Sequence, residues 1–177
     1  IARRQRQMCI RDREKVAYGI DLINAQKSDV LVFTGDLVNN KADEIESYKD
    51  LFSKLQAPYG KFSILGNHDY GDYIAWPSEK AKAENLNNLK KHHADMGFSL
   101  LLNENEVLEK QGAKISLAGV ENWGKPPFVQ YGDLEKALQG TEAFKVLLSH
   151  DPSHFDEQVK NHKNKVHLTL SGHTHGM

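Results

Sequence analysis

Four short polar motifs, each placed directly after a short apolar run, contain the residue types that could do chemistry. They lie at residues 35–36 (GD), 66–69 (GNHD), 149–151 (SHD) and 172–176 (GHTHG). Imidazole nitrogens bind Zn, Fe, Ni or Mn, whereas carboxylate and amide oxygens bind Mn, Mg or Fe. The glycines would let the backbone approach a metal or a phosphate without a Cβ in the way. Together the four motifs predict a site for divalent metal ions.

Each motif also has a purely structural explanation. Gly-Asp after a strand is usually a turn, and Asn-His-Asp in a loop can be turn chemistry beside a surface histidine. Ser-His-Asp can begin a helix. A hydrolase triad is a weaker interpretation, because triad geometry comes from the fold and not from adjacency in sequence. The occurrence of all four motifs in this order, each after an apolar run, favours one shared site.

Short apolar runs alternate with amphipathic stretches, which is typical of an α/β domain. The spacing predicts strands at 29–34, 61–65, 144–148 and 166–170, and helices at 13–26, 45–55, 78–96, 133–138 and 152–161. Further strands at 98–102, 107–109 and 114–120 are expected to form an antiparallel section. Side chains just past the carboxyl ends of strands converge on one rim of an open sheet, which would gather the four motifs.

Other residues around these elements also have expected roles. Ser78 is expected to cap the helix at 78–96, and His92 and His93 are expected to be solvated on that polar helix. Tyr73 and Trp123 either shape a substrate cleft or take part in local packing.

Length and composition restrict the class of protein. A chain of 177 residues predicts one domain, and its net charge of −1 gives no electrostatic reason to bind nucleic acid or an anionic membrane. Cys9 is the one cysteine, so an internal disulfide is excluded. No apolar run approaches the ~20 residues of a membrane helix. The chain as given is expected to be soluble, and its location is left open.

The order GD, GNHD, SHD, GHTHG resembles the calcineurin-like metallophosphoesterase family over most of the chain. The strings GNHDY, LSHDP and GHTHG are similar to a bacterial phosphodiesterase-type subgroup. This resemblance implies an α/β fold in which two mixed β-sheets pack as a sandwich flanked by helices, the four-layer metallophosphoesterase fold. It also implies a dinuclear centre of Mn, Fe or Zn and a metal-activated water that hydrolyses a phosphate ester.

The resemblance implies a metal-binding role for the residues that match the family motifs. Asp36 would bridge the two metals. Asn67, His150 and His173 would complete the second metal, and His175 would bind the first.

The resemblance also implies a catalytic pair within the GNHD motif. His68 would contact the phosphate and help to protonate the leaving group. Asp69 would orient His68 by a hydrogen bond, as residues behind a first layer of ligands do in metal sites.

One departure from the family pattern concerns the first metal. The family opens with an Asp-x-His motif, which is absent from this sequence. Residues 1–12, which are rich in arginine, are therefore interpreted as a foreign segment, with a basic nucleic-acid-binding arm as the alternative. Residues 13–177 would be a partial domain, truncated at its N-terminus and also near its C-terminus. We expect about one metal and weak activity in this chain, against two metals in the intact parent.

The substrate is expected to be a small phosphate ester, either a phosphomonoester or a phosphodiester. The bacterial subgroup includes lipid-sugar nucleotide hydrolases, often attached to a membrane through upstream segments, so a lipid-linked or nucleotide phosphodiester is one prediction. A nuclease of the same fold is an alternative, disfavoured by the near-neutral charge. A non-catalytic scaffold is another, disfavoured by the intact GNHD and GHTHG motifs.

Overall fold

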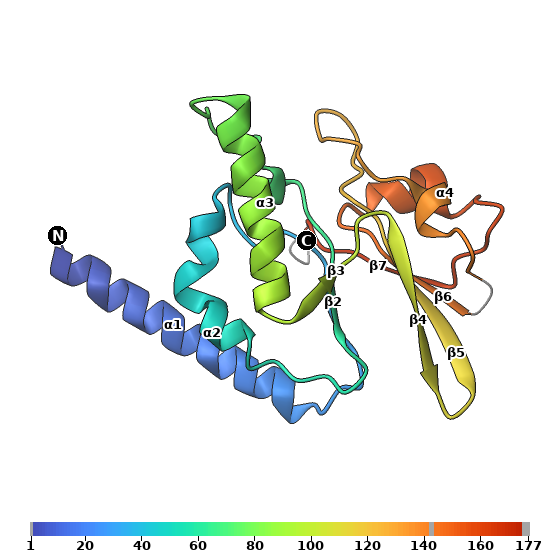
Figure 1. Ribbon diagram of the computed structural model, residues 1–177, viewed down its shortest axis with the longest axis horizontal. Helices are drawn as coiled ribbons and strands as arrows, with labels where there is room; N and C mark the ends of the chain where they lie inside the picture. The colour runs from blue at the N-terminus through green and yellow to red at the C-terminus, as the bar shows by residue number, and fades with distance from the viewer. Residues whose placement is uncertain (1, 142–143, 175–177) are drawn as a thin grey trace.

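Two β-sheets form the centre of the molecule (Figure 1). The computed structural model describes residues 2–141 and 144–174, with side chains described from residue 12 onward. The first sheet has the order β1-β2-β3 and is parallel, and the second has the order β4-β5-β6-β7. In the second sheet β4 is antiparallel to β5, whereas β5, β6 and β7 are parallel. The strands are β1 (Leu31–Phe33), β2 (Lys61–Ser63), β3 (Phe98–Leu100), β4 (Glu104–Lys110), β5 (Ala113–Gly119), β6 (Phe144–Leu148) and β7 (Leu168–Leu170).

Helices cover the outer face of each sheet, as Figure 1 shows. On one side lie α1, α2 and α3, and on the other lies α4 with a π-helical turn. The two sheets thus lie between two helical layers, which confirms the predicted sandwich. The bounds are α1 (Ala2–Ala25), the 3-10 helix η1 (Ala42–Tyr48), α2 (Lys49–Phe52), the 3-10 turn η2 (His68–Tyr70), α3 (Glu79–Asp95), α4 (Leu134–Ala137) and the π-helical turn η3 (Phe155–Val159).

Alternation of side chains along the strands explains why the layers stack. Successive side chains of a strand point to opposite faces. Along β2 and the residues that follow it, Phe62 and Ile64 pack between the two sheets, whereas Leu65 joins the core beneath the helices. The core between the sheets consists of Phe62, Ile64, Leu101, Leu117 and Leu148, all buried. Both faces of β2 and of the residues that follow it are therefore apolar, as a buried parallel strand requires.

Local signals placed several helix boundaries correctly. The Ser78 side chain accepts a hydrogen bond from the Ala81 backbone N–H at 3.1 Å, so the predicted cap of α3 is confirmed. Asp133 caps α4 in the same way through Lys136 N. The helix predicted at 13–26 is the end of a longer helix, α1, which begins at Ala2.

The strand at 98–102 was assigned to the wrong partner. We expected it to be antiparallel to the next strands, but β3 is parallel to β2, with Phe62 paired to Ser99. Helix α3 returns the chain to the start of the first sheet, which makes the β2-α3-β3 connection a parallel crossover. The antiparallel prediction holds only for the hairpin of β4 and β5.

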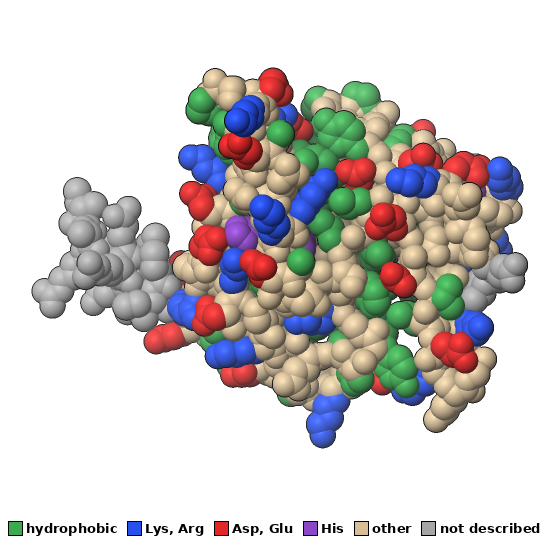
Figure 2. Space-filling view, in the orientation of Figure 1, with side chains coloured by type: hydrophobic (Ala, Val, Ile, Leu, Met, Phe, Trp, Pro, Cys, Tyr) green, Lys and Arg blue, Asp and Glu red, His purple; other side chains and the backbone are tan. Residues whose placement is uncertain are grey.

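The surface carries no dominant charge on the face in view. Figure 2 shows acidic and basic side chains interspersed over that face, in keeping with the net charge of −1. In the part of the chain that the structure describes, no helix combines the length and the apolar character needed to cross a bilayer.

Two histidines of α3 are buried, contrary to the expectation that they would be solvated. His93 is 1% exposed, and its Nδ1 lies 2.9 Å from the hydroxyl of Ser63 on β2. His92 Nε2 lies 3.2 Å from the Glu46 carboxylate of η1. The helix packs these two side chains against the sheet and η1, so its polar composition did not indicate which face is buried. Burial, followed by the neighbouring His92, lowers the pKa of His93 to about 4.

We expect the stability of the protein to fall with acidification because of His93. In the unfolded chain a histidine pKa is about 6.5, above the folded value of about 4. The stabilisation is therefore complete above about pH 6.5 and is lost as the pH falls through 4, because the unfolded state takes up the proton first. Between pH 7 and 4.5 the wild type should lose about 2–3 kcal/mol more free energy of unfolding than a His93→Gln variant. Urea unfolding at both pH values measures this loss of stability. His167→Gln, at an exposed histidine, is the control and should lose as much as the wild type. Equal losses in all three proteins would show that His93 is not responsible.

Candidate metal centre

Four loops that follow strands bring their polar side chains to one point. Asp36 follows β1, Asn67 follows β2, His150 follows β6 and His173 follows β7. His150 Nε2 lies 3.2 Å from Asp36 Oδ2 and 3.1 Å from Asn67 Oδ1. His173 Nδ1 lies 2.9 Å from the same amide oxygen. The structure thus gathers these four predicted side chains, two from each sheet, and those of Asp36, His150 and His173 offer ligand atoms within 4.8 Å of one another.

The atoms that meet at this point are mostly acceptors. His150 Nδ1 lies 2.6 Å from the Thr34 carbonyl, to which only an N–H can be donated, so in neutral His150 the lone pair is on Nε2. That lone pair faces a carboxylate oxygen of Asp36 and the amide oxygen of Asn67. Acceptors that face one another are stabilised only by a proton or a cation between them. Carboxylate, amide and imidazole donors also form a set that suits Mn, Fe or Zn, so these residues fit a divalent metal.

The charges of Asp36 and His150 are coupled. Burial acts to raise the pKa of Asp36, but the hydrogen bond and positive charge of His150, with the His68 backbone N–H, bring that pKa below its ordinary value. Burial acts to lower the pKa of His150, but Asp36 and the Thr34 carbonyl bring it above its ordinary value. The carboxylate is thus held ionised, which is the state that binds a metal.

Two glycines permit the close approach of the β1 and β2 loops. A Cβ added to Gly35 would lie 2.7 Å from His150 Nδ1. A Cβ added to Gly66 would lie 2.6 Å from both the Asp36 backbone nitrogen and His150 Cε1, and nearer still to the Asp36 carboxylate. These distances are shorter than non-bonded atoms tolerate, so the motif glycines are needed for the convergence of the ligands.

The backbone is strained at two of the candidate ligands. Asp36 has φ of 59° and His173 has φ of 64°, in the left-handed region that side-chain-bearing residues rarely adopt. Such conformations cost of order 1–3 kcal/mol and concentrate at functional sites. Lys27, Asn103 and Gln111 adopt the same conformation away from the cluster. The strain at Asp36 and His173 therefore accords with a functional use without identifying one by itself.

Asp69 has a different set of partners from the one expected. We predicted that it would orient His68, but its carboxylate accepts backbone N–H groups of Gly66 and of the 36–38 loop, at 2.8–3.2 Å. His68 Nδ1 instead lies 2.9 Å from the Asn39 carbonyl. Burial raises the pKa of Asp69 to about 6, against the opposing effect of the N–H donors. Asp69 therefore joins the loops after β1 and β2, and so holds Asp36 in place.

The SHD motif supplies one candidate ligand and two structural residues. Ser149 Oγ lies 2.8 Å from Nδ1 of His154, a buried histidine further along the chain. Asp151 accepts the Ser153 backbone N–H at 2.8 Å, as at the start of a helical turn. The contacts of Ser149 and Asp151 therefore do not form a hydrolase triad with His150.

Other predicted residues lie at the edges of the site or beyond it. Trp123 stacks on the buried His154, so it takes part in local packing. Tyr73, in contrast, contacts His68, with ring centroids 4.7 Å apart. Phe128, which the sequence did not indicate, contacts His173, with ring centroids 4.9 Å apart. His175, predicted to bind the first metal, lies outside the described residues.

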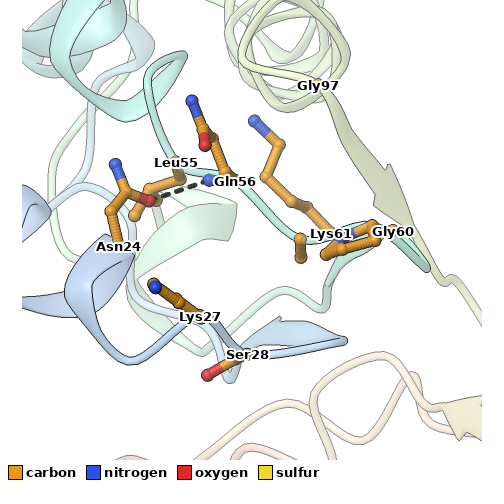
Figure 3. Close-up of a pocket in the computed structure, with 10 residues that line it drawn as sticks. Asn24, Lys27, Ser28, Leu55, Gln56, Gly60, Lys61 and Gly97 are labelled. Carbon is orange, nitrogen blue, oxygen red and sulfur yellow. Dashed lines mark hydrogen bonds between the residues drawn. The ribbon is translucent and has the colours of Figure 1, made fainter.

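A separate surface pocket of about 570 Å³ lies near the amino end of β2 (Figure 3). Its lining includes Asn24, whose side-chain oxygen accepts the Gln56 backbone N–H at 2.9 Å, and Lys61, the first residue of β2. The candidate metal centre lies at the other end of the strand, after Ser63. This pocket therefore does not belong to the candidate metal centre.

Comparisons with known proteins agree with the fold and the motifs. The sequence profile described as "Calcineurin-like phosphoesterase" matches residues 10–177. An uncharacterized metallophosphoesterase of Bacillus subtilis, YkuE, is 34% identical over 160 residues, covering 87% of this chain and 49% of the relative. An uncharacterized metallophosphoesterase of Aquifex aeolicus is 31% identical, covering 85% of this chain and 52% of the relative.

More distant relatives extend the comparison. A zebrafish protein named "Transmembrane protein with metallophosphoesterase domain" is 29% identical, covering 92% of this chain and 36% of the relative. The solved structure of Haemophilus influenzae NAD nucleotidase superposes with a TM-score of 0.57 at 16% identity, covering 90% of this chain and 32% of that one. At that identity the superposition shows the fold alone. The chain spans about half the length, or less, of the relatives it matches.

Proposed function

This chain belongs to the calcineurin-like phosphoesterase family of hydrolases, and from that premise we propose that it hydrolyses small phosphate esters at a metal centre built on Asp36. The observation that supports this most is that an acceptor oxygen of Asp36 and one of Asn67 both lie within 3.2 Å of His150 Nε2. A scaffold with a decayed site would have no reason to keep such a costly, partly buried cluster of acceptors.

We propose that Asp36, Asn67, His150 and His173 hold one divalent ion, and that Asp36 and His175 contribute to a second in the intact protein. We take residues 13–177 as the phosphoesterase domain and residues 1–12 as a foreign segment. The chain with these bounds would hold one ion firmly. Divalent ions of this kind supply Lewis-acid polarisation of a phosphoryl oxygen and a lowered pKa of bound water. Mn, Fe and Zn are the candidates, because the donor set mixes oxygen with imidazole nitrogen.

The protein's own groups would orient the reaction. The Thr34 carbonyl holds the His150 ring so that Nε2 faces the centre. The Asn39 carbonyl holds His68 through Nδ1, and Nε2 of His68 has no hydrogen-bond partner in the described part of the chain. We assign to that Nε2 the contact with the phosphate and the transfer of a proton to the leaving oxygen. Asp69 acts through the backbone of the 36–38 loop, which it holds in position.

The test combines metal binding with turnover. The metal-free chain is titrated with Mn²⁺ in a calorimeter, and hydrolysis of bis-p-nitrophenyl phosphate and of p-nitrophenyl phosphate is followed with Mn²⁺, Fe²⁺ or Zn²⁺. We expect about one tightly bound ion per chain and slow, metal-dependent turnover above an Asp36→Ala control. Turnover indistinguishable from that control with every metal would contradict the proposed activity. Two tightly bound ions would contradict the proposed stoichiometry alone.

The substrate proposal is a small phosphate ester, with lipid-linked or nucleotide phosphodiesters as the classes to compare. The zebrafish relative is named as a transmembrane protein, and we propose that a membrane attachment of this protein would lie in segments outside the described residues. A panel of a nucleoside diphosphate sugar, a lipid-linked pyrophosphate and a phosphomonoester separates these classes by their kcat/KM values.

A further inference from the structure

Tyr73 contacts two candidate site residues at once. Its hydroxyl oxygen accepts a hydrogen bond from Asn67 Nδ2 at 2.6 Å. Its ring lies against the His68 ring, with centroids 4.7 Å apart and planes inclined by 35°. One side chain thus touches both the amide that faces the metal centre and the imidazole assigned to the phosphate.

The loop that presents Tyr73 is held on both sides. After the 3-10 turn η2, Gly71 adopts φ of 69° and reverses the chain toward the site. The Gly71 carbonyl accepts a hydrogen bond from Trp76 Nε1 at 2.7 Å, and Asp72 forms an ion pair with Lys82 of α3. Tyr73 itself is 50% exposed. Its position therefore comes from its anchored neighbours and its two site contacts, and the fold does not depend on burying it.

The Asn67 amide is planar, so holding one end of it determines where the other end points. With Nδ2 on the Tyr73 hydroxyl, Oδ1 lies 3.1 Å from His150 Nε2 and 2.9 Å from His173 Nδ1. A rotated amide would direct an N–H donor toward the centre, where a cation needs an oxygen. Only the Oδ1-inward orientation is useful for binding a metal.

We propose that Tyr73 is a positioning residue of the metal centre, which acts by holding the Asn67 amide with its oxygen inward and by supporting the His68 ring. This inference rests on the proposed function of the site. The hydroxyl and the ring have separable effects: the hydroxyl bears on metal affinity, and the ring bears on the step that uses His68.

Two variants separate these effects. Tyr73→Phe removes the hydroxyl and keeps the ring, whereas Tyr73→Leu removes both. We expect each to raise the Kd for Mn²⁺ by about 10-fold, as loss of a residue that orients a ligand does in other metal sites. At saturating Mn²⁺, kcat for bis-p-nitrophenyl phosphate should return close to the wild-type value in Tyr73→Phe and stay lower in Tyr73→Leu. Thermal unfolding of the metal-free chain should be unchanged in both.

Calorimetric titration of the metal-free proteins with Mn²⁺ gives a readout that does not depend on turnover. Tyr18→Phe, at a tyrosine of α1 that is 66% exposed, is the matched control and should bind Mn²⁺ as the wild type does. Wild-type affinity in Tyr73→Phe, or an equal loss in Tyr18→Phe, would overturn this inference and leave the proposed function standing. A wild-type chain that binds no Mn²⁺ would overturn both.

Discussion

Asp36→Asn should reduce Mn²⁺ affinity by at least about 100-fold and should bring turnover to background. Residues that only orient a metal ligand typically cost about 10–100-fold in affinity, so the loss expected here is larger. The substitution keeps the shape of the side chain and removes its charge. Asparagine Oδ1 can still accept the His68 backbone N–H, which lies 3.0 Å from the present Oδ1. Its Nδ2 would then face His150 Nε2, 3.2 Å from the present Oδ2. This N–H would be donated to the lone pair of His150 Nε2. The lone pair would then no longer be available to bind a metal ion.

The same substitution should not destabilise the metal-free protein. At a pH where His150 is neutral, Asp36 Oδ2 and His150 Nε2 are two acceptors that face each other, and an amide that donates to His150 removes this mismatch. Thermal unfolding of the metal-free chain should therefore stay at or above the wild-type midpoint, while Mn²⁺ no longer raises it. Asp43→Asn, at an exposed carboxylate of η1, is the control and should keep the Mn²⁺-dependent shift. Wild-type Mn²⁺ binding by Asp36→Asn would exclude Asp36 as a ligand.

Gly66→Ala should damage the site as severely through a single methyl group. The added Cβ would lie 2.6 Å from the Asp36 backbone nitrogen and 2.6 Å from His150 Cε1, so the β1 and β2 loops would have to separate. The Asp69 carboxylate spans the same junction through the Gly66 and Asp36 N–H groups, both at 2.9 Å, and those bonds would lengthen too. We expect loss of Mn²⁺ binding together with a fall of about 1–3 kcal/mol in the free energy of unfolding, typical of overpacking.

Gly19→Ala provides the matched control for Gly66→Ala. Gly19 lies within α1, and a Cβ there would meet no heavy atom within 4 Å. Alanine favours helix over glycine by about 0.5–1 kcal/mol, so this variant should be slightly more stable and should bind Mn²⁺ normally. Urea unfolding measures the stability of both variants, and Mn²⁺ titration measures their metal binding. Normal Mn²⁺ binding by Gly66→Ala would show that the two loops tolerate separation, against the proposed geometry.

Local patterns in the sequence predicted much of the framework. The apolar run at 144–148 matches β6 residue for residue, and Ser78 and Asp133 mark the starts of α3 and α4. These signals succeed because the apolar character of a strand and the capping of a helix depend on neighbouring residues. The partner of β3 was predicted wrongly because strand pairing joins residues far apart in the sequence, and the local pattern of a strand does not contain that information.

The sequence by itself determined that Asp36, Asn67, His150 and His173 would each stand at the carboxyl end of a strand, because short motifs and strand endings are local. Only the tertiary structure decided what surrounds them. It directed Asp69 to the backbone of the β1 loop instead of to His68, placed the Tyr73 hydroxyl on Asn67, and buried His93 against Ser63. These contacts join residues that the packing of loops, helices and sheets brings together, and the orientation of a side chain depends on that packing more than on its position in a motif.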